Sequence, residues 1–330
     1  MNLLDPNSTA FATLRILADG QRYSGADLAR RLDLSRAAIW KSVQKLIEMG
    51  LPISAQRGRG YQLKPAIELL SASVIQRYIK PNRRALCPVI NVTPVTDSTN
   101  SVLMNERCLD PAVLFTEWQT AGRGRHHRPW HSQIGSGILF SVRWQFDSDP
   151  GELSGLSLAC GVAVVKALAH YGVDCAQLKW PNDVLVNHKK LAGILVEMIA
   201  AANSRTTVVI GIGMNTAIDP SRPIHIDQEW SDIFSITGKR VARNRLAGLL
   251  LDALIATLDQ FSRTGFLTFA QAWQQHHALA GAKVRVQHGH TMIDGIAIGV
   301  NNQGALIIEK EDGIHIAVHS GEVQSLRRSN

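Results

Sequence analysis

The sequence predicts an α+β protein made of three consecutive domains. Three observations carry this prediction. Residues 1–64 have the pattern of short helices followed by a hairpin, residues 65–278 mix single strands, hairpins and long helices, and residues 279–330 alternate apolar and polar positions between turns. A chain of 330 residues is also too long for one ordinary hydrophobic core. We therefore expect a mixed or antiparallel sheet in the middle domain and a small barrel of five short strands at the end.

The positive charge of the chain is concentrated near its beginning. Of a formal net charge of +8, residues 1–64 supply +5, because ten Lys and Arg there face five Asp and Glu, whereas residues 282–330 hold five of each and sum to zero. A nucleic-acid surface is therefore expected in the first domain and not in the last.

Cysteine usage and hydropathy predict a cytoplasmic protein without a membrane anchor. The four cysteines lie far apart and show no CxxC spacing, which argues against a disulfide framework or a zinc site. The first residues show neither the basic region nor the apolar run of a signal peptide. We find no apolar run that approaches the roughly 18 residues of a membrane helix.

The first domain is expected to be a winged helix-turn-helix. After a short amphipathic helix at 9–18, two helices at 25–31 and 36–49 are joined by three residues, which is the spacing of a helix-turn-helix. Ser35 stands where a side-chain oxygen caps the second of these helices. The alternation over 51–63 then predicts a small hairpin with a basic tip, the wing.

Side chains suited to DNA lie on the helix at 36–49 and at the hairpin tip. Their basic, amide and indole groups match the major groove and its phosphates. The expected contacts are Ser35, Arg36, Trp40, Lys41, Gln44, Lys45, Arg57 and Arg59. The alternative is a three-helix protein-interaction domain with a solvated charged face, since helix-turn-helix shapes also occur without DNA. Charge, caps and wing together favour DNA.

The most informative segment is a loop rich in glycine and arginine at 122–130, with the sequence GRGRHHRPW. It holds three arginines, and no Asp or Glu occurs between Trp118 and Phe146. Small residues and uncompensated positive charge suit close backbone approach to a polyanion. Trp130 at its end can stack on a ring. The alternative is an ordinary flexible basic loop.

Three more motifs stand at the ends of predicted strands. Residues 179–183, KWPND, place a lysine, an amide and a carboxylate around a proline. Polar groups at the end of an apolar strand need partners that satisfy them. Lys190 opens an apolar strand and can neutralise a carboxylate or phosphate. Residues 211–215, GIGMN, let a ligand approach, but lack the helix and acidic residue of a dinucleotide fingerprint. Each has a plain structural alternative, a capped turn or a strand-end lysine, and together they favour a nucleotide site.

Taken together, these motifs resemble those of bifunctional biotin–protein ligases, the type that also acts as the biotin operon repressor. The resemblance covers essentially the whole chain. It rests on DSTN at 97–100, QTAGRGR at 119–125, KWPND at 179–183, KLAGILVE at 190–197 and GIGMN at 211–215. It implies a catalytic domain of the biotin/lipoate ligase type between the winged helix and an SH3-like β-barrel.

The resemblance implies ATP-dependent chemistry in two steps. The carboxylate of biotin attacks the α-phosphate of ATP, giving biotinyl-5′-adenylate and pyrophosphate, and a lysine of a biotin carrier protein, an acetyl-CoA carboxylase subunit, then attacks the activated carbonyl. Because two anions meet in the first step, cations must cancel charge, and Mg²⁺ that comes with ATP normally helps without a cage of side chains. The adenylate-bound homodimer is expected to bind operator DNA and repress biotin synthesis.

The resemblance also assigns residues of this chain to roles. The catalytic set is Lys190, Arg125, Asp183 and Lys179. The biotin-binding set is Ser98, Thr99, Asn100, Gln119, Gly122, Arg123, Gly124, Arg125, Lys190 and Gly193. The adenylate-binding set is Arg123, Arg125, Arg128, Trp130, Asn182, Asn215 and Arg327. Residues 321–327 are expected to fold back on the central domain.

One residue departs from the family loop, which usually has glycine where His127 stands. If that position has a positive φ, His127 should strain the loop or change its ordering. Two other functions fit part of the pattern. One is a ligase for lipoate or octanoate, which does not usually combine the arginine loop with KWPND. The other is a non-enzymatic repressor that only senses a ligand, which needs no charge placed at a phosphate.

Overall fold

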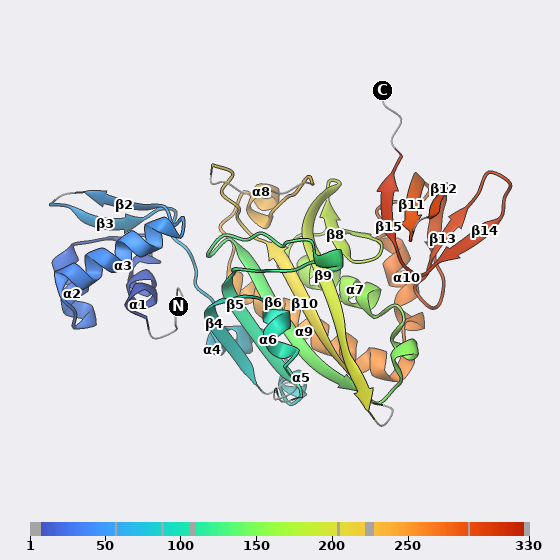
Figure 1. Cartoon of the computed structure of the whole chain (residues 1–330), viewed down its shortest axis with the longest axis horizontal. Helices are drawn as coiled ribbons and strands as arrows, with labels where there is room; N and C mark the ends of the chain where they lie inside the picture. Colours follow the sequence, from blue (N-terminus) through green and yellow to red (C-terminus); the bar gives the residue numbers. More distant parts are fainter. Residues whose placement is uncertain are drawn as a thin grey trace.

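The computed structural model describes residues 8–56, 58–86, 89–105, 108, 110–202, 205–221, 228–289 and 291–326. Two predicted site residues, Arg57 and Arg327, lie outside the described residues. The described chain forms three sheets, of three, seven and five strands, which follow one another along the molecule in chain order (Figure 1). The seven-stranded sheet combines one parallel pair with antiparallel pairs, which confirms the predicted α+β class with a mixed central sheet.

The first domain has the predicted helices and wing. Each helix begins after a serine whose hydroxyl accepts a backbone N–H of the first turn, at Ser8, Ser24 and Ser35. The elements are α1 (Thr9–Leu17), β1 (Arg22–Tyr23), α2 (Gly25–Leu32), α3 (Arg36–Glu48), β2 (Ile53–Gln56) and β3 (Gly60–Leu63). Their apolar faces share a core of their own, so this domain packs around its own centre.

The central sheet has the strand order β4-β5-β6-β10-β9-β8-β7. Its strands are β4 (Ile90–Thr96), β5 (Ala112–Gln119), β6 (Gly137–Phe146), β7 (Gln177–Lys179), β8 (Asp183–Val186), β9 (Lys189–Ala202) and β10 (Arg205–Asn215). β4 and β5 are parallel, and β6, β10 and β9 follow as antiparallel neighbours. The C-terminal ends of β4, β5 and β10 therefore lie at the same edge as the N-terminal ends of β6 and β9.

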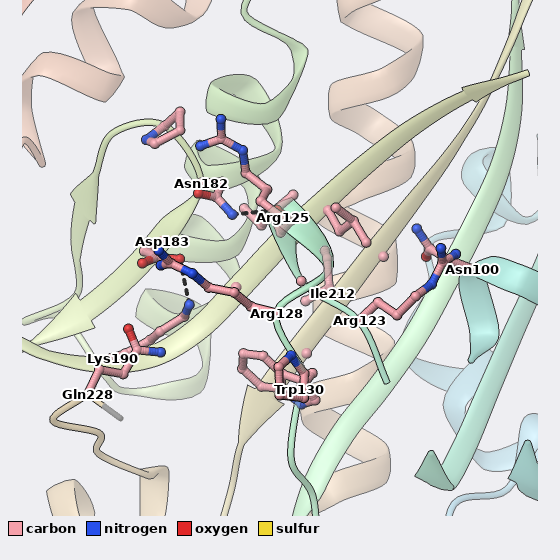
Figure 2. Close-up of a pocket in the computed structure, with 18 of the residues that line it drawn as sticks. Asn100, Arg123, Arg125, Arg128, Trp130, Asn182, Asp183, Lys190, Ile212 and Gln228 are labelled. Atoms are coloured by element: carbon pink, nitrogen blue, oxygen red, sulfur yellow. Dashed lines mark hydrogen bonds and ion pairs between the residues drawn. The ribbon is translucent and has the colours of Figure 1, made fainter. Parts of the chain in front are cut away.

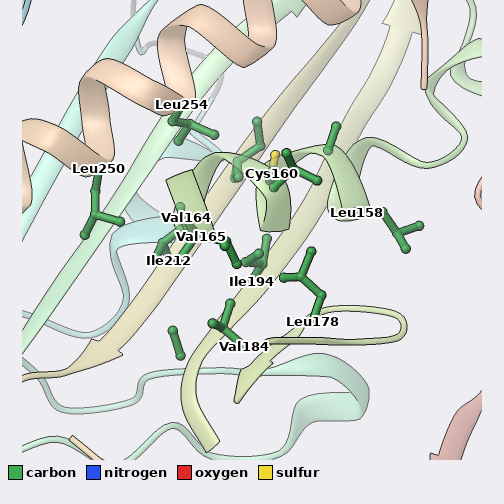
Figure 3. Close-up of a cluster of buried hydrophobic side chains, with 14 of the residues drawn as sticks. Leu158, Cys160, Val164, Val165, Leu178, Val184, Ile194, Ile212, Leu250 and Leu254 are labelled. Atoms are coloured by element: carbon green, nitrogen blue, oxygen red, sulfur yellow. The ribbon is translucent and has the colours of Figure 1, made fainter. Parts of the chain in front are cut away.

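Two long helices, α7 (Leu156–Tyr171) and α9 (Arg243–Thr264), cover one face of this sheet, with α10 (Leu267–Gln275) beside them. Figure 3 shows part of the core, where Val165 and Leu254 from the helices lie in one buried cluster with Ile212 from the sheet. Full burial of one such side chain stabilises the fold by about 1.5–3 kcal/mol. The core therefore holds the strand ends that carry the polar motifs in fixed positions.

One segment of this core corrects the expectation that no apolar run approaches the length of a membrane helix. Residues Pro150–Tyr171 are long and apolar enough to cross a membrane by length and composition, with a mean hydropathy of 1.6. In the structure 67% of the most apolar window is buried within the protein. A helix that is apolar all round is the usual form of a central core helix, and α7 takes that position.

Several one-turn helices were not predicted, because a single turn is too short to show periodicity. They are α4 (Ala72–Ile75), η1 (Gln76–Tyr78), α5 (Pro81–Arg84) and α8 (Ile233–Thr237). The first three lie between the first sheet and the central sheet. The strands nearest to the predicted domain boundaries at 64/65 and 278/279 end at Leu63 and begin at Lys283, and the boundaries themselves stay predictions.

The last domain is an antiparallel sheet of five short strands in the order β14-β13-β12-β11-β15. The strands are β11 (Lys283–His288), β12 (Thr291–Val300), β13 (Leu306–Glu309), β14 (His315–Val318) and β15 (Glu322–Ser325). The indole N–H of Trp180 donates to the carbonyl of Gly304 at 3.0 Å, and the hydroxyl of Ser154 donates to the carbonyl of Gln303 at 2.8 Å. These bonds join the sheet to the central domain next to KWPND.

Candidate active site

The predicted motifs meet around one cavity of about 530 Å³ at the edge of the central sheet. The floor comes from the strands β7 to β10, the loop 122–130 crosses above it, and β15 borders one side. Figure 2 shows Lys190 and Asp183 at one end and Asn100 and Arg123 at the other. Pockets for small ligands typically enclose about 300–1,000 Å³, so the cavity can hold a molecule of that size.

Lys190 and Asp183 form an ion pair at the first end of the cavity. The Nζ of Lys190 lies 2.9 Å from Oδ1 of Asp183, and each side chain is only 17% exposed. The hairpin of β8 and β9 brings them together: Asp183 lies opposite Gly193, and a register shift after Val184 sets Lys190 opposite Leu185. A partly dehydrated cation beside a cavity attracts an incoming anion more strongly than a cation in water does.

The KWPND segment owes its position to the buried indole of Trp180, which is 2% exposed and bonded to Gly304. Asn182 is held against β9 by two bonds to Ile194. Its side-chain amide donates to the backbone carbonyl of Ile194 at 2.9 Å. Its backbone carbonyl accepts the N–H of Ile194, also at 2.9 Å. Lys179 and Asn182 both line the cavity. The motif is thus more than a capped turn, because its polar side chains face a ligand-sized space.

An indole above two glycines makes the middle of the cavity. A Cβ on Gly213 would lie 2.5 Å from the ring of Trp130, and a Cβ on Gly193 would lie 3.2 Å from it. The Nζ of Lys190 lies 5.6 Å from the centroid of the same ring, within cation–π range. Trp130 therefore reaches from the loop to the charged end, and both glycines are required by its position.

The second end of the cavity is polar and buried. Ser98 caps the short helix α6 (Thr99–Leu103), which follows β4 and turns Thr99 and Asn100 toward β6 and β10. Both residues are 3% exposed. The backbone N–H of Thr99 donates to Oε1 of Gln119 at 2.7 Å. This end offers hydrogen bonds where the other end offers charge.

The loop 122–130 folds as a narrow hairpin. The N–H of Trp130 donates to the carbonyl of Gly122 at 2.8 Å, and the N–H of Gly124 donates to the carbonyl of Arg128 at 2.7 Å. At its tip His126 and His127 have φ values of +53° and +57°, in the left-handed region that favours glycine. His127 thus adopts the positive φ on which the expected strain depends, and His126 shares it.

Two arginines of the loop contact the C-terminal sheet. A guanidinium nitrogen of Arg128 lies 2.7 Å from Oε2 of Glu322, and Arg125 donates to the carbonyl of Gly321 at 3.2 Å. Burial lowers the pKa of Arg125, while the carboxylates of Glu322 and Asp183 act to raise it. The guanidinium stays charged at neutral pH, so Arg125 holds a half-buried positive charge at the cavity.

Arg123 points toward the polar end, away from Lys190 (Figure 2). Its guanidinium lies 3.2 Å from Oε1 of Glu197, a residue of β9. The sequence placed Arg123 in both the biotin set and the adenylate set, and its side chain in this structure lies with the biotin set. The carboxylate of Glu197 explains the difference. Glu197 ends the KLAGILVE motif, but the resemblance assigned it no role in the site.

Most of the predicted site residues line the cavity. They are Ser98, Thr99, Asn100, Gln119, Arg123, Gly124, Arg125, Arg128, Trp130, Lys179, Asn182, Asp183, Lys190 and Gly193. Two are not among the lining residues. The amide of Asn215 donates to the carbonyl of Ser231 at 3.1 Å, and Gly122 supports Trp130 through its carbonyl. The two residues support the site through these bonds, and their expected contacts with the ligand stay predictions.

The structure also adds residues that sequence reasoning missed. They are Phe140, Gln228, Glu322 and Gln324 on the lining, with Ser141 and Glu197 hydrogen-bonded to it. Glu322 had one usable signal, because residues 321–327 were expected to fold back on the central domain. Ser141 and Phe140 lie inside a predicted buried strand, where one polar residue gives no indication of its partner.

The site fits a metal that arrives with phosphates. In the part of the chain that the structure describes, no three His, Cys, Asp or Glu side chains cluster to hold a metal ion. Mg²⁺ in nucleotide enzymes usually needs only one or two protein carboxylates, because phosphates and waters supply the other ligands. Asp183 is a carboxylate at the charged end of the cavity that meets this need.

The predicted DNA contacts lie on α3 and the wing, at the far end of the molecule from the C-terminal sheet (Figure 1). Arg36, Trp40 and Lys41 are exposed, whereas Gln44 and Lys45 are half-buried. Trp40 is 54% exposed, which is unusual for an indole without an apolar partner. Ser35 caps α3 through the N–H of Ala38 at 3.1 Å, and Arg59 is exposed beside the wing tip.

Comparison with known families divides the chain as its three sheets do. Residues 10–62 match the model of an HTH domain, residues 92–215 match the biotin/lipoate A/B protein ligase family, and residues 281–325 match the biotin protein ligase C-terminal domain. The second match contains the loop, KWPND and Lys190.

Relatives that match over most of their own length support the same assignment. A bifunctional ligase/repressor BirA of Escherichia coli is 34% identical over 323 residues, covering 97% of this chain and 98% of that one. A biotin–[acetyl-CoA-carboxylase] ligase of Mycobacterium tuberculosis is 34% identical over 247 residues, 72% of this chain and 89% of that one. The structure of Aquifex aeolicus biotin protein ligase in complex with biotin and ATP superposes with a TM-score of 0.62 at 29% identity, covering 73% of this chain and 99% of that one. The chain belongs to the family of bifunctional biotin–protein ligases that also act as repressors.

Proposed function

We propose that this cavity converts biotin and ATP to biotinyl-5′-adenylate and then passes biotin to a lysine of a biotin carrier protein, a subunit of acetyl-CoA carboxylase. The observation that carries the proposal is the order of groups along the cavity: buried hydrogen-bonding side chains, an apolar middle under Trp130, and the cation of Lys190. Biotin has the same order of groups, with a ureido ring, an apolar chain and a carboxylate.

The first step joins two anions, and the positive charge of the site lowers its barrier. A carboxylate oxygen of biotin attacks the α-phosphorus, the P–O bond to pyrophosphate breaks, and pyrophosphate leaves. Lys190 lies at the cavity end where the carboxylate and the α-phosphate would meet. Arg125 and Arg128 would cover the phosphates from the loop. Cations fixed in place before the reaction stabilise the developing charge without reorganising.

We propose that Mg²⁺ enters with ATP and is held on the protein side by Asp183 and the amide oxygen of Asn182. The ion would supply further charge neutralisation at the phosphates. Asp183 then has two electrostatic partners, Lys190 and the ion. Because Lys190 pairs with Asp183 in this structure, nucleotide binding is expected to compete for that carboxylate and free the ammonium for the substrate.

The second step needs a neutral amine next to the mixed anhydride. We propose that Lys179 and Asp183 position the incoming lysine of the carrier, because both line the charged end of the cavity. The amine nitrogen attacks the acyl carbon, an amide forms, AMP leaves with the bonding electrons, and the ammonium proton is released. We place this reaction in the cytoplasm, where ATP and the carrier would be available.

The first domain extends the proposal to transcription. We propose that the adenylate orders the loop 122–130, favours a homodimer, and lets two winged helices bind a palindromic operator. The exposed basic and indole side chains of α3 and the HTH match support a DNA-binding role. The contacts would be made by Ser35, Arg36, Trp40, Lys41, Gln44, Lys45, Arg57 and Arg59.

Pyrophosphate release tests the enzymatic part. The purified chain is mixed with ATP and Mg²⁺, and biotin, lipoate or octanoate is added in separate reactions, each with and without an apo carrier domain. Release only with biotin, together with a covalently biotinylated carrier, supports the proposal. Release only with lipoate or octanoate would assign the related ligase activity instead, and ligand binding without any release would leave a sensing role.

Gel shift and sedimentation test the regulatory part. The chain is titrated against DNA from upstream of the biotin operon of its own genome, with biotin and ATP present or absent. The expected result is a dimer and tighter DNA binding only when both ligands are present. An unchanged oligomer with and without the ligands would contradict the coupling.

A further inference from the structure

We infer that Glu197 is a positioning residue that sets the direction of a buried chain of hydrogen bonds and so makes the hydroxyl of Thr99 an acceptor for a ring N–H of the substrate. The inference rests on the proposed function, because it needs the ureido ring to lie at the polar end of the cavity. Glu197 is not among the residues that the sequence assigned to the site. It acts through two buried neighbours, Asn100 and Ser141.

The chain of hydrogen bonds links Glu197 to Thr99. The amide Nδ2 of Asn100 donates to Oε2 of Glu197 at 2.7 Å. The hydroxyl oxygen of Ser141 lies 2.5 Å from Oδ1 of Asn100 and 2.6 Å from Oγ1 of Thr99. Ser141 is fully buried, so water cannot supply a donor at its two contacts.

The carboxylate of Glu197 decides where the hydrogens of Asn100 and Ser141 point. A carboxylate only accepts, so Glu197 fixes the amide of Asn100 with Nδ2 toward itself and Oδ1 toward Ser141. Oδ1 also only accepts, so the single hydroxyl hydrogen of Ser141 must point at Asn100. The alternative leaves two oxygens 2.5 Å apart without a hydrogen between them, which costs the bond and adds repulsion.

The same argument fixes Thr99. Since the hydrogen of Ser141 is used, the contact at 2.6 Å requires Thr99 to donate its hydroxyl hydrogen to Ser141. The Thr99 hydroxyl also lies 3.0 Å from Oε1 of Gln119. That oxygen already accepts the backbone N–H of Thr99 at 2.7 Å, whereas no other hydrogen can fill the shorter contact between Thr99 and Ser141. The lone pairs of the Thr99 hydroxyl are then what it offers to the cavity. The N–H of a cyclic urea is the matching donor.

Two features of the surroundings keep this arrangement in place. A Cβ on Gly211 would overlap Oδ1 of Asn100, so only glycine on β10 leaves room for that amide. Arg123 forms an ion pair with Glu197, with 3.2 Å between the guanidinium and Oε1. The guanidinium of the loop thereby covers the end of the chain that carries the negative charge.

The direction of the chain can be tested by exchanging the acid and the amide. In Glu197→Gln the carboxamide can turn its NH₂ toward Asn100, the Asn100 amide can flip, and Thr99 can become a donor. We expect KM for biotin to rise by about tenfold or more, in line with loss of a buried hydrogen bond, with kcat and KM for ATP within about twofold. Asn100→Asp places two carboxylates in contact and should also raise KM for biotin.

The double variant Glu197→Gln/Asn100→Asp restores the original direction. The new carboxylate at position 100 would accept from Ser141, and the new amide at position 197 would donate to that carboxylate. We expect KM for biotin to fall to within about threefold of the wild type, a coupling that two independent structural defects would not produce. Glu311→Gln, an exposed change on the C-terminal sheet, serves as the matched control. Thermal unfolding of each variant shows that it is folded.

The outcomes separate the inference from the proposed function. Biotin KM unchanged in Glu197→Gln, or a double variant no better than the worse single variant, would overturn the inference. Thr99→Val distinguishes the two claims: if it leaves KM for biotin unchanged in an active enzyme, the ureido ring is not bound here and the placement fails. If Thr99→Val raises KM while the exchange shows no coupling, only the inference fails. In Arg123→Gln, we expect that adding Asn100→Asp does not lower KM for biotin.

Discussion

The floor of the cavity, which is made by β7 to β10, and its roof, the loop 122–130, hold their charges in different ways. On the floor, Lys190 and Asp183 stand on paired strands of a sheet that is packed against α7 and α9. On the roof, Arg125 and Arg128 stand on a short hairpin whose tip has two residues in left-handed conformations, and they are held by contacts to Gly321 and Glu322. The comparison indicates that the floor provides the geometry of the reaction, and that the roof retains the intermediate.

The largest expected effect comes from removing the floor cation. Lys190→Ala should slow adenylate formation by about 10²–10³-fold or more, the scale seen when one preorganised charge-stabilising group is lost. Biotin affinity should change much less, since the ammonium acts mainly on charge that develops at the phosphate. Single-turnover pyrophosphate release and calorimetric biotin binding measure the two quantities. Equal losses in both would contradict this role.

The next prediction concerns the free energy of unfolding and the buried residue His277, which supports the floor. His277 is 6% exposed and lies beside Leu178 of β7. Its ring packs against that of Trp273, with centroids 4.6 Å apart and planes tilted by 38°. Neither of its ring nitrogens has a hydrogen-bond partner among the described residues. Burial lowers the pKa of His277 from 6.5 to about 4.

Between those pKa values the unfolded chain binds a proton that the folded chain does not. The contribution of His277 to stability is therefore complete above pH 6.5 and is lost as the pH falls toward 4. At ~1.4 kcal/mol per pKa unit, about 3 kcal/mol is lost across this range. Unfolding of His277→Phe, measured at pH 7 and at pH 4.5, should show a smaller difference than the wild type. The same pH difference in both proteins would refute the assignment.

The contact between roof and floor can be broken at Gly213. Gly213→Ala places a methyl 2.5 Å from the ring of Trp130, so the indole must move. Displacement of an active-site group by about 1 Å can cost on the order of 10²-fold in rate, and we expect kcat/KM to fall by about that factor. A control is Gly151→Ala, where nothing lies within 4 Å of the added Cβ and where, as at Gly213, φ is not positive. Wild-type activity in Gly213→Ala would show that the ring position does not matter.

The smallest effect is expected at the tip of the roof. His127 has a φ of +57°, and a non-glycine residue in this region costs on the order of 1 kcal/mol. His127→Gly should relieve that strain and slow dissociation of the adenylate by a few-fold. Stopped-flow dissociation of the adenylate compares the two proteins. Equal rates would remove His127 as a cause of weaker retention.

The floor was easier to predict from the sequence than the roof. Lys190 and KWPND stand at the ends of apolar strands, and the pattern therefore located both the residues and the sheet edge. The first domain was equally predictable, because Ser24 and Ser35 mark its helix starts. The direction of an arginine in a loop depends on partners distant in sequence, and so Arg123 on Glu197 and Arg128 on Glu322 could not be predicted. The hydrogen bonds of Ser141 with Thr99 and Asn100 could not be predicted for the same reason.

One pair of variants tests the division between floor and roof most directly. Adenylate formation and adenylate dissociation are measured in single turnovers for Lys190→Ala and for Arg125→Gln. We expect the first variant to lose formation by at least about 10²-fold and the second mainly to speed dissociation, with formation reduced much less. If Lys190→Ala forms the adenylate at nearly the wild-type rate while Arg125→Gln does not, the chemistry depends on the roof and not on the floor.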